Sequence, residues 1–330
     1  MNETAYVIET IVKAVVVLSI IAALAGFATY VERKVLGLMH RRLGPMHVGP
    51  YGILQVLADG IKLFTKEDVI PQNVVRPIFL IAPLISVVTA FLALAAVPFL
   101  PEFTIFGYTV SPIISDISVG ILFVLAVSSS GLYAPLLAGL SSSNKWSLIG
   151  GARASIQLLS FEVITALSIL APLMLVGSLS LIDINDYQSG GFFDWLIWKQ
   201  PVAFILFVIA GFAETNRVPM DLLEAESEIV SGYATEYSGI RWGYFFIGEY
   251  ANMITISFLV SLTFLGGYNS LWIIPGSVMI IFKVMAFMFF FIWVRGAWPH
   301  IRPDQLMTLC WKALMPIALI NILITGIVLL

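Results

Sequence analysis

Long runs of apolar residues alternate along this chain with short polar segments. A helix that crosses a bilayer needs about 20 mostly apolar residues, and eight runs approach that length. We therefore predict eight transmembrane helices, at about 13–30, 78–98, 117–140, 154–180, 201–219, 243–265, 271–294 and 313–330. The fifth prediction is the weakest, because only 13 apolar residues precede Glu214. The pattern indicates an all-α integral membrane protein with a single membrane domain over residues 1–330.

Composition agrees with this class of protein. Hydrophobic residues make up 59% of the chain and charged residues 11%, with a mean hydropathy of +0.98, whereas soluble domains carry about 25% charged residues. A net charge of −3 provides no basic surface for nucleic acid. The one cysteine, Cys310, excludes a disulfide framework and a cysteine-ligated iron–sulfur cluster on this chain. The three histidines lack the spacing of metal ligands, so we expect them at the surface.

The distribution of lysine and arginine predicts the orientation in the membrane. The odd-numbered loops between the predicted helices (31–77, 141–153, 214–242 and 295–312) hold 14 of these residues, and the N-terminal tail and even-numbered loops hold one. Cytoplasmic loops are enriched in positive residues. We therefore expect the odd-numbered loops in the cytoplasm and both termini on the outer side.

The first cytoplasmic loop contains a helix-like stretch at 53–66. Its polar residues Gln55, Asp59, Lys62 and Lys66 recur at helical spacing, and apolar residues occupy most of the remaining positions. This pattern is typical of an amphipathic helix that lies in the membrane interface. On pattern alone, a simple surface anchor and a helix that borders a binding site are equally well supported.

The loop at 214–242 is unusually acidic. It contains two arginines and six acidic residues, Glu214, Asp221, Glu224, Glu226, Glu228 and Glu236. If the segment after Pro219 is helical, Asp221, Glu224 and Glu228 share one face. Crowded carboxylates hold protons more tightly, which suits proton transfer, but a solvated loop that docks a basic partner explains the same residues.

Two glutamates lie inside predicted membrane helices. Glu162 and Glu249 both fall roughly 9–12 Å from the cytoplasmic edge of their predicted spans, at 1.5 Å per residue. An ionised group near the centre of a membrane helix costs about 2.5–3.5 kcal/mol. A hydrogen bond between helices explains either glutamate alone, but the pair favours a polar cavity open to the cytoplasm. Lys283 is predicted near the middle of the seventh helix.

Polar motifs that follow one another in a specific order carry a resemblance to a known family. They are Glu32–Lys34, Arg41–Pro45, Ala58–Leu63, Ala213–Arg217, Asp221–Glu228, Glu236–Gly239, Gly248–Tyr250 and Asp304–Met307. Over essentially its whole length the chain resembles the H subunit of the proton-pumping NADH–quinone oxidoreductase, respiratory complex I. It departs from the family pattern at Val56, Met220, His300 and Pro303, which leaves the packing of the cytoplasmic loops open.

The resemblance implies roles for two sets of residues. Those expected to line, order or border a quinone chamber are Glu32, Arg33, Asp59, Lys62, Arg217 and Arg295. Those expected to form a charged connection for protons are Glu162, Glu214, Asp221, Glu224, Glu226, Glu228 and Glu249. No catalytic residue and no metal ligand is expected on this chain alone.

The resemblance also implies what surrounds the chain. Quinone would be the substrate, while NADH, FMN and iron–sulfur clusters would bind partner subunits rather than this chain. Other membrane-arm and peripheral-arm subunits would be its partners, including the one that carries the terminal iron–sulfur cluster. The location would be the bacterial cytoplasmic (inner) membrane, with both termini periplasmic and no role in nucleic-acid binding.

Three alternatives remain open at the level of sequence. The first is a homologous subunit of a complex fed by a ferredoxin-type or hydrogenase-type donor. The second is a stand-alone secondary transporter. Many transporters contain matched inverted repeats, and this sequence shows none. The third is a structural anchor that binds a soluble arm through the loop at 214–242.

Overall fold

The structure, a computed structural model, describes the backbone of residues 3–105, 108–223, 226–270 and 274–330 and the side chains of 9–104, 111–223, 228–270 and 274–330. Its helices are α1 (Glu3–Met39), α2 (Gln55–Thr65), α3 (Arg76–Ala93), α4 (Gly120–Ser130), α5 (Tyr133–Ser141), α6 (Lys145–Val176), α7 (Leu181–Tyr187), α8 (Leu196–Lys199), α9 (Pro201–Glu214), α10 (Glu226–Ile229), α11 (Gly239–Phe264), α12 (Gly276–Ala297), α13 (Pro303–Leu309) and α14 (Met315–Leu329). A short antiparallel hairpin, β1 (Phe103–Ile105) and β2 (Tyr108–Val110), is the exception to the all-α prediction.

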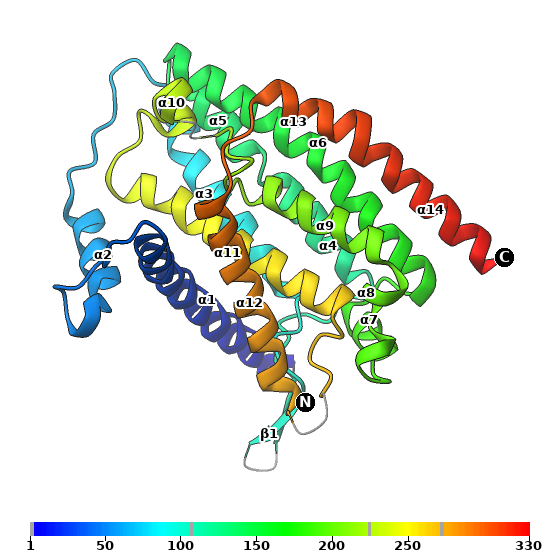
Figure 1. Ribbon diagram of the computed structural model, residues 1–330. Coiled ribbons are helices and arrows are strands. Elements are labelled where there is room, and N and C mark those ends of the chain that lie inside the picture. The colour runs from blue at the N-terminus through cyan, green and yellow to red at the C-terminus, as the bar shows by residue number, and fades with distance from the viewer. Residues whose placement is uncertain (1–2, 106–107, 224–225, 271–273) are drawn as a thin grey trace.

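The helices form one bundle whose two ends carry different elements. Helices α2 and α10 lie toward one end, and the hairpin, α7, α8 and both termini lie toward the other (Figure 1). This arrangement places the predicted cytoplasmic loops together and the predicted outer loops together.

Seven helical segments of the described chain are long and apolar enough to cross a membrane. They are Glu9–Met39, Arg76–Ala96, Gly120–Ser141, Lys145–Val176, Gly239–Phe264, Gly276–Ala297 and Pro303–Leu329. They correspond to seven of the eight predicted spans and confirm a multi-pass, mainly helical membrane protein.

The fifth predicted span is shorter than expected. Helix α9 has 14 residues, which is about 21 Å at 1.5 Å per residue, against a hydrocarbon core of about 30 Å. The prediction at 201–219 extends too far, because the chain turns at Asn216, where φ is +53°. Glu214 is therefore the last residue of a short apolar helix and lies beside a turn.

The first helix is longer than expected. The sequence predicts that the motif Glu32–Lys34 starts a loop, but α1 continues through it to Met39 as a helix of 37 residues. Glutamate, arginine, lysine and leucine are good helix formers, so the end of the apolar run is not the end of the helix. As a consequence, Glu32 and Arg33 are held on a rigid element.

The third span consists of two helices, because α4 ends at Ser130 and α5 begins at Tyr133. Before the break, the hydroxyl groups of Ser129 and Ser130 donate to carbonyl oxygens of their own helix, at 2.7 and 2.6 Å. Such bonds often bend helices. The break places Ser129 opposite α6.

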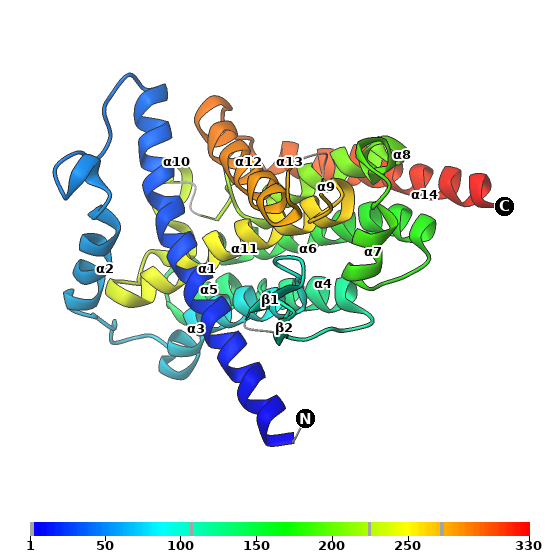
Figure 2. The same cartoon turned by 90° about the horizontal axis from the view of Figure 1, so that it is seen from below.

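Helix α11 is the centre of the bundle. Of its most apolar 18-residue stretch, 78% is buried, a larger share than in any other spanning segment of the described chain. It packs against α3, α12 and α1, and Figure 2 shows it between α12 and α3. Polar groups on α11 are consequently held away from lipid.

Lys283 lies in the first half of α12, seven residues after Gly276. Its ammonium group donates to the carbonyl oxygens of Leu265 and Gly267, the latter at 2.8 Å. It also lies 4.3 Å from the centre of the Trp195 ring. The carbonyl oxygens follow the last residue of α11, where the helix dipole favours a cation. Lys283 therefore caps α11 and belongs to a structural site.

We expect Lys283→Met to lower the free energy of unfolding by about 1–3 kcal/mol, because two buried carbonyl oxygens lose their donor. The measurement is the thermal unfolding midpoint of the detergent-solubilised chain. Lys199→Met is the matched control, since Lys199 also stacks on an aromatic ring but is exposed. Equal midpoints for the two variants would show that Lys283 has no capping role.

Candidate functional site

A buried ion cluster lies between α1, α11, α12 and the turn after α9. Its anion is Glu32, which is 6% exposed. Arg217 binds its carboxylate at 3.1 Å, Arg295 forms a second ion pair with it, and the Tyr250 hydroxyl donates to it at 2.7 Å. Two cations share one anion, so the cluster has a net positive charge. The structure thus brings together three residues predicted to order a quinone chamber, and Tyr250 joins them.

Arg217 does not use all of its hydrogen-bond donors in the contact with Glu32. It is 4% exposed, and its guanidinium lies 4.2 Å from the centre of the Tyr250 ring. Its Nε and Nη2 groups have no hydrogen-bond partner among the described residues. Buried donors are almost always satisfied, by protein or by ordered water, so the site favours an additional oxygen acceptor.

Arg33 and Asp59 join α2 to α1. Their ion pair has a length of 2.5 Å, and Gln55 donates to the second oxygen of Asp59 at 2.8 Å. Lys62, also predicted for this site, is exposed. The opposite face of α2 is apolar and exposed, with Leu57, Ile61 and Phe64 at 64%, 64% and 75%. That α2 is an amphipathic helix in the membrane interface stays a prediction.

Three glutamates line one cavity. Glu162 comes from α6, Glu214 from the end of α9 and Glu249 from α11, and hydroxyl groups of α3 and α4 also line it, together with apolar residues. The cavity has a volume of about 40 Å³. A water molecule needs about 10–15 Å³ on this scale, so the cavity has room for about three. The predicted polar cavity that contains both Glu162 and Glu249 is present in the structure.

The glutamates of the cavity have specific partners. The Ser129 hydroxyl lies within hydrogen-bond distance of Glu162, and the Thr165 hydroxyl lies 3.5 Å from Glu214. Glu162 and Glu214 are close enough for their charges to repel each other. Two of the cavity glutamates therefore lie beside hydroxyl groups and close to each other.

The acidic loop does not form the predicted single carboxylate face. Among the described residues between Pro219 and Glu228, the α-helix begins only at Glu226. Glu228 is ion-paired with Arg153 of α6, and the His300 ring lies 2.7 Å from the carbonyl oxygen of Asp221. Glu224 lies outside the described residues, as does the side chain of Glu226. Local turns replace the expected helix, so Asp221 and Glu228 have separate partners.

Tyr237 holds the end of this loop against α3. Its ring stacks on Phe79 at 4.1 Å, and its hydroxyl donates to the carbonyl oxygen of Phe79 at 3.2 Å. Burial raises the pKa of Tyr237 to about 12, so the hydroxyl stays protonated and keeps its role as a donor at neutral pH.

Comparison with known proteins agrees with this architecture. The family model described as NADH dehydrogenase matches residues 12–326. The chain is 70% identical to the H subunit of NADH-quinone oxidoreductase from Wolinella succinogenes, with 99% of each chain covered. It is 68% identical to the protein of that name from Nitratiruptor sp., again with 99% of each covered, and 66% identical to that of Helicobacter hepaticus, with 99% and 98% covered.

The chain belongs to the NADH dehydrogenase family. The resemblance drawn from the polar motifs is thereby confirmed.

Some site residues of this family member do not stand out in the sequence. Tyr250 follows Glu249 in the motif Gly248–Tyr250, but nothing in the pattern shows that its hydroxyl faces Glu32. Ser129 lies in a run of three serines inside an apolar segment, a signal that could have indicated a polar lining. Gln157 is fully buried in α6, and it is an uncharged polar residue that a search for charges within the predicted spans does not find.

We expect Glu32→Gln to lower the free energy of unfolding by about 3 kcal/mol, because Arg217 and Arg295 lose their shared anion. The denaturant midpoint of the purified chain measures this change. Asp304→Asn is the control, since its partner Arg302 is 3.9 Å away and their side chains are 73% and 69% exposed; such pairs contribute little. If both variants unfold at the wild-type midpoint, the cluster is not an important source of stability.

Proposed function

We propose that this chain is the membrane subunit of a complex I-type NADH–quinone oxidoreductase that forms the quinone chamber and couples quinone reduction to proton translocation. The observation that carries the proposal is the cavity lined by Glu162, Glu214 and Glu249, which has room for water. It lies beside an ion cluster rich in arginine, and the names of the relatives support the same function. As a subunit the chain contributes to an oxidoreductase without a complete active site of its own.

On the quinone side, we assign the chamber to Glu32, Arg33, Arg217 and Arg295. The unpartnered donors of Arg217 suit an oxygen of water or of a polar ligand. Asp59 and Lys62 would border the opening on α2. The exposed apolar face of α2 would lie on the lipid, so a long-tailed quinone would reach the cluster from the bilayer.

On the proton side, the cavity glutamates would exchange protons through its water. Glu228 and Asp221 would extend this connection toward the cytoplasmic end, together with Glu224 and Glu226. A purely structural anchor would need no ionisable groups at Glu162 and Glu249, which face a cavity rather than a partner. Quinone is the proposed substrate, and NADH, FMN and iron–sulfur clusters would be held by partner subunits of both arms.

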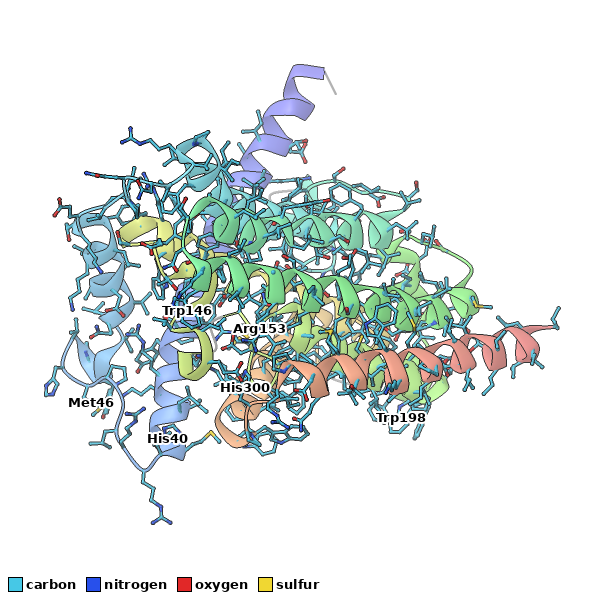
Figure 3. All side chains as sticks on the ribbon, turned by 90° about the horizontal axis from the view of Figure 1, so that it is seen from above. His40, Met46, Trp146, Arg153, Trp198 and His300 are labelled. Atoms are coloured by element: carbon cyan, nitrogen blue, oxygen red, sulfur yellow. The ribbon has the colours of Figure 1, made fainter. Side chains whose placement is uncertain are left out.

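We also assign the chain an eight-span topology in the bacterial inner membrane, with α9 as a short fifth span and both termini periplasmic. Both ends of the bundle fit this orientation. His40, Arg153 and His300 lie toward one end and Trp198 toward the other (Figure 3). The first group belongs to loops and helix ends rich in Lys and Arg, as the cytoplasmic side requires.

Replacing Glu214 or Glu249 by glutamine is expected to leave assembly intact and to lower proton pumping on the order of tenfold, because a proton-exchanging group is lost. NADH-driven quinone reduction and proton uptake are measured on the intact complex in proteoliposomes. Glu67→Gln removes an exposed carboxylate and is the control. Full coupled activity in both cavity variants would exclude the proposed proton route.

Single cysteines test the topology after Cys310, which is buried, is replaced by serine. A cysteine at Lys66 should react with a membrane-impermeant maleimide only in inside-out vesicles. A cysteine at Phe193, which is 83% exposed, should react only from the periplasmic side. Reaction of both positions from one side would contradict the eight-span arrangement.

A further inference from the structure

We propose that Gln157 is a positioning residue that holds the turn after α9 in the shape needed by both the ion cluster and the cavity. This inference rests on the proposed function and deepens it. Gln157 lies on α6, is not part of the cavity wall, and has a side chain that is 0% exposed.

The contacts of Gln157 close the turn at both ends. Its amide nitrogen donates to the carbonyl oxygen of Ala213 at 3.0 Å and to that of Met220 at 2.6 Å. The six residues between these two anchors include Glu214 and Asn216, which line the cavity, and Arg217, which pairs with Glu32. One side chain thus fixes the distance between the start and the end of the segment that serves both sites.

The chemistry requires an amide at this position. Both acceptors are carbonyl oxygens, so only a group with two N–H bonds satisfies them together. The carbonyl oxygen of Gln157 has no partner among the described residues and is buried. A flipped amide would direct that oxygen at the two acceptors, so the orientation is determined by the turn. A methionine has similar length but donates nothing.

The turn itself needs such support. Asn216 has a φ of +53°, and a left-handed conformation of a residue other than glycine persists only where the surrounding structure holds it. Its side-chain oxygen is also buried without a partner among the described residues. Backbone hydrogen bonds close each half of the turn separately: Asn216 donates to Ala213 at 3.3 Å, and Met220 donates to Arg217 at 2.9 Å. Gln157 ties both ends of the segment to α6.

The experiment compares Gln157→Met, Glu214→Gln and the double variant in the purified holo-complex. For Gln157→Met we expect about tenfold lower turnover per assembled complex, from the loss of two buried hydrogen bonds that orient the turn. Protons pumped per quinone reduced should fall as well. Because Gln157 acts on pumping through the position of Glu214, the double variant should pump no fewer protons per quinone reduced than Glu214→Gln alone.

Gln200→Met is the matched control. Gln200 is also buried, and its amide binds Thr325 at 2.9 Å and Asn321 at 3.1 Å, near the outer end of the bundle. Its loss should lower the thermal midpoint without changing turnover per assembled complex or the pumping ratio. If Gln157→Met fails to assemble, Gln157→Asn keeps the amide but shortens its reach, and the same cycle is run with it.

The outcomes separate this inference from the proposed function. Wild-type turnover and pumping in Gln157→Met would overturn the positioning role, and so would effects of Gln157→Met and Glu214→Gln on the pumping ratio that multiply. A loss of assembly in both Gln157 variants, with normal turnover in the complexes that do form, would also overturn it. Full activity of Glu214→Gln would instead overturn the proposed proton route, whatever the result at Gln157.

Discussion

The cost of an ionised group away from water is the constraint on which the rest of this structure depends. In hydrocarbon each buried charge needs an opposite charge, a set of dipoles or a hydrated space. The chain uses all three solutions: Glu32 is bound by two arginines, Lys283 by two carbonyl oxygens, and the cavity glutamates by hydroxyl groups and room for water. Helix α11 carries Glu249 and Tyr250, which must be kept away from lipid, and its position at the centre of the bundle achieves this.

These three ways of accommodating a charge differ in the function that they permit. A cation held by two carbonyl oxygens, as at Lys283, serves stability. A carboxylate bound by two arginines, as at Glu32, ties α1 to α12 and to the turn after α9. Glu162 and Glu214 instead line a cavity with room for water, which is why the cavity rather than the ion cluster carries the proton side of the proposal.

Much of the fold was predictable because hydrocarbon imposes a long apolar pattern on each helix. The predictions of helix ends that were wrong have physical causes. The end of the apolar run does not end α1, since Glu32 and Arg33 are good helix formers, and α9 stops early because Asn216 adopts a left-handed turn. It was predictable that Glu162 and Glu249 line one cavity, because an ionised group has a high free-energy cost inside the membrane. The contact of Tyr250 with Glu32 was not, because 218 residues separate them and periodicity carries no information on partners.

Two neighbouring residues of α11 show how closely the ion cluster and the cavity are joined. Successive side chains on a helix point about 100° apart, so Glu249 lines the cavity while Tyr250 faces Glu32. The turn after α9 repeats this division, with Glu214 on the cavity and Arg217 on the cluster. Arg217 is also within electrostatic range of Glu249. The two sites therefore share α11 and the turn after α9, so a change in the charge or position of one site directly affects the other.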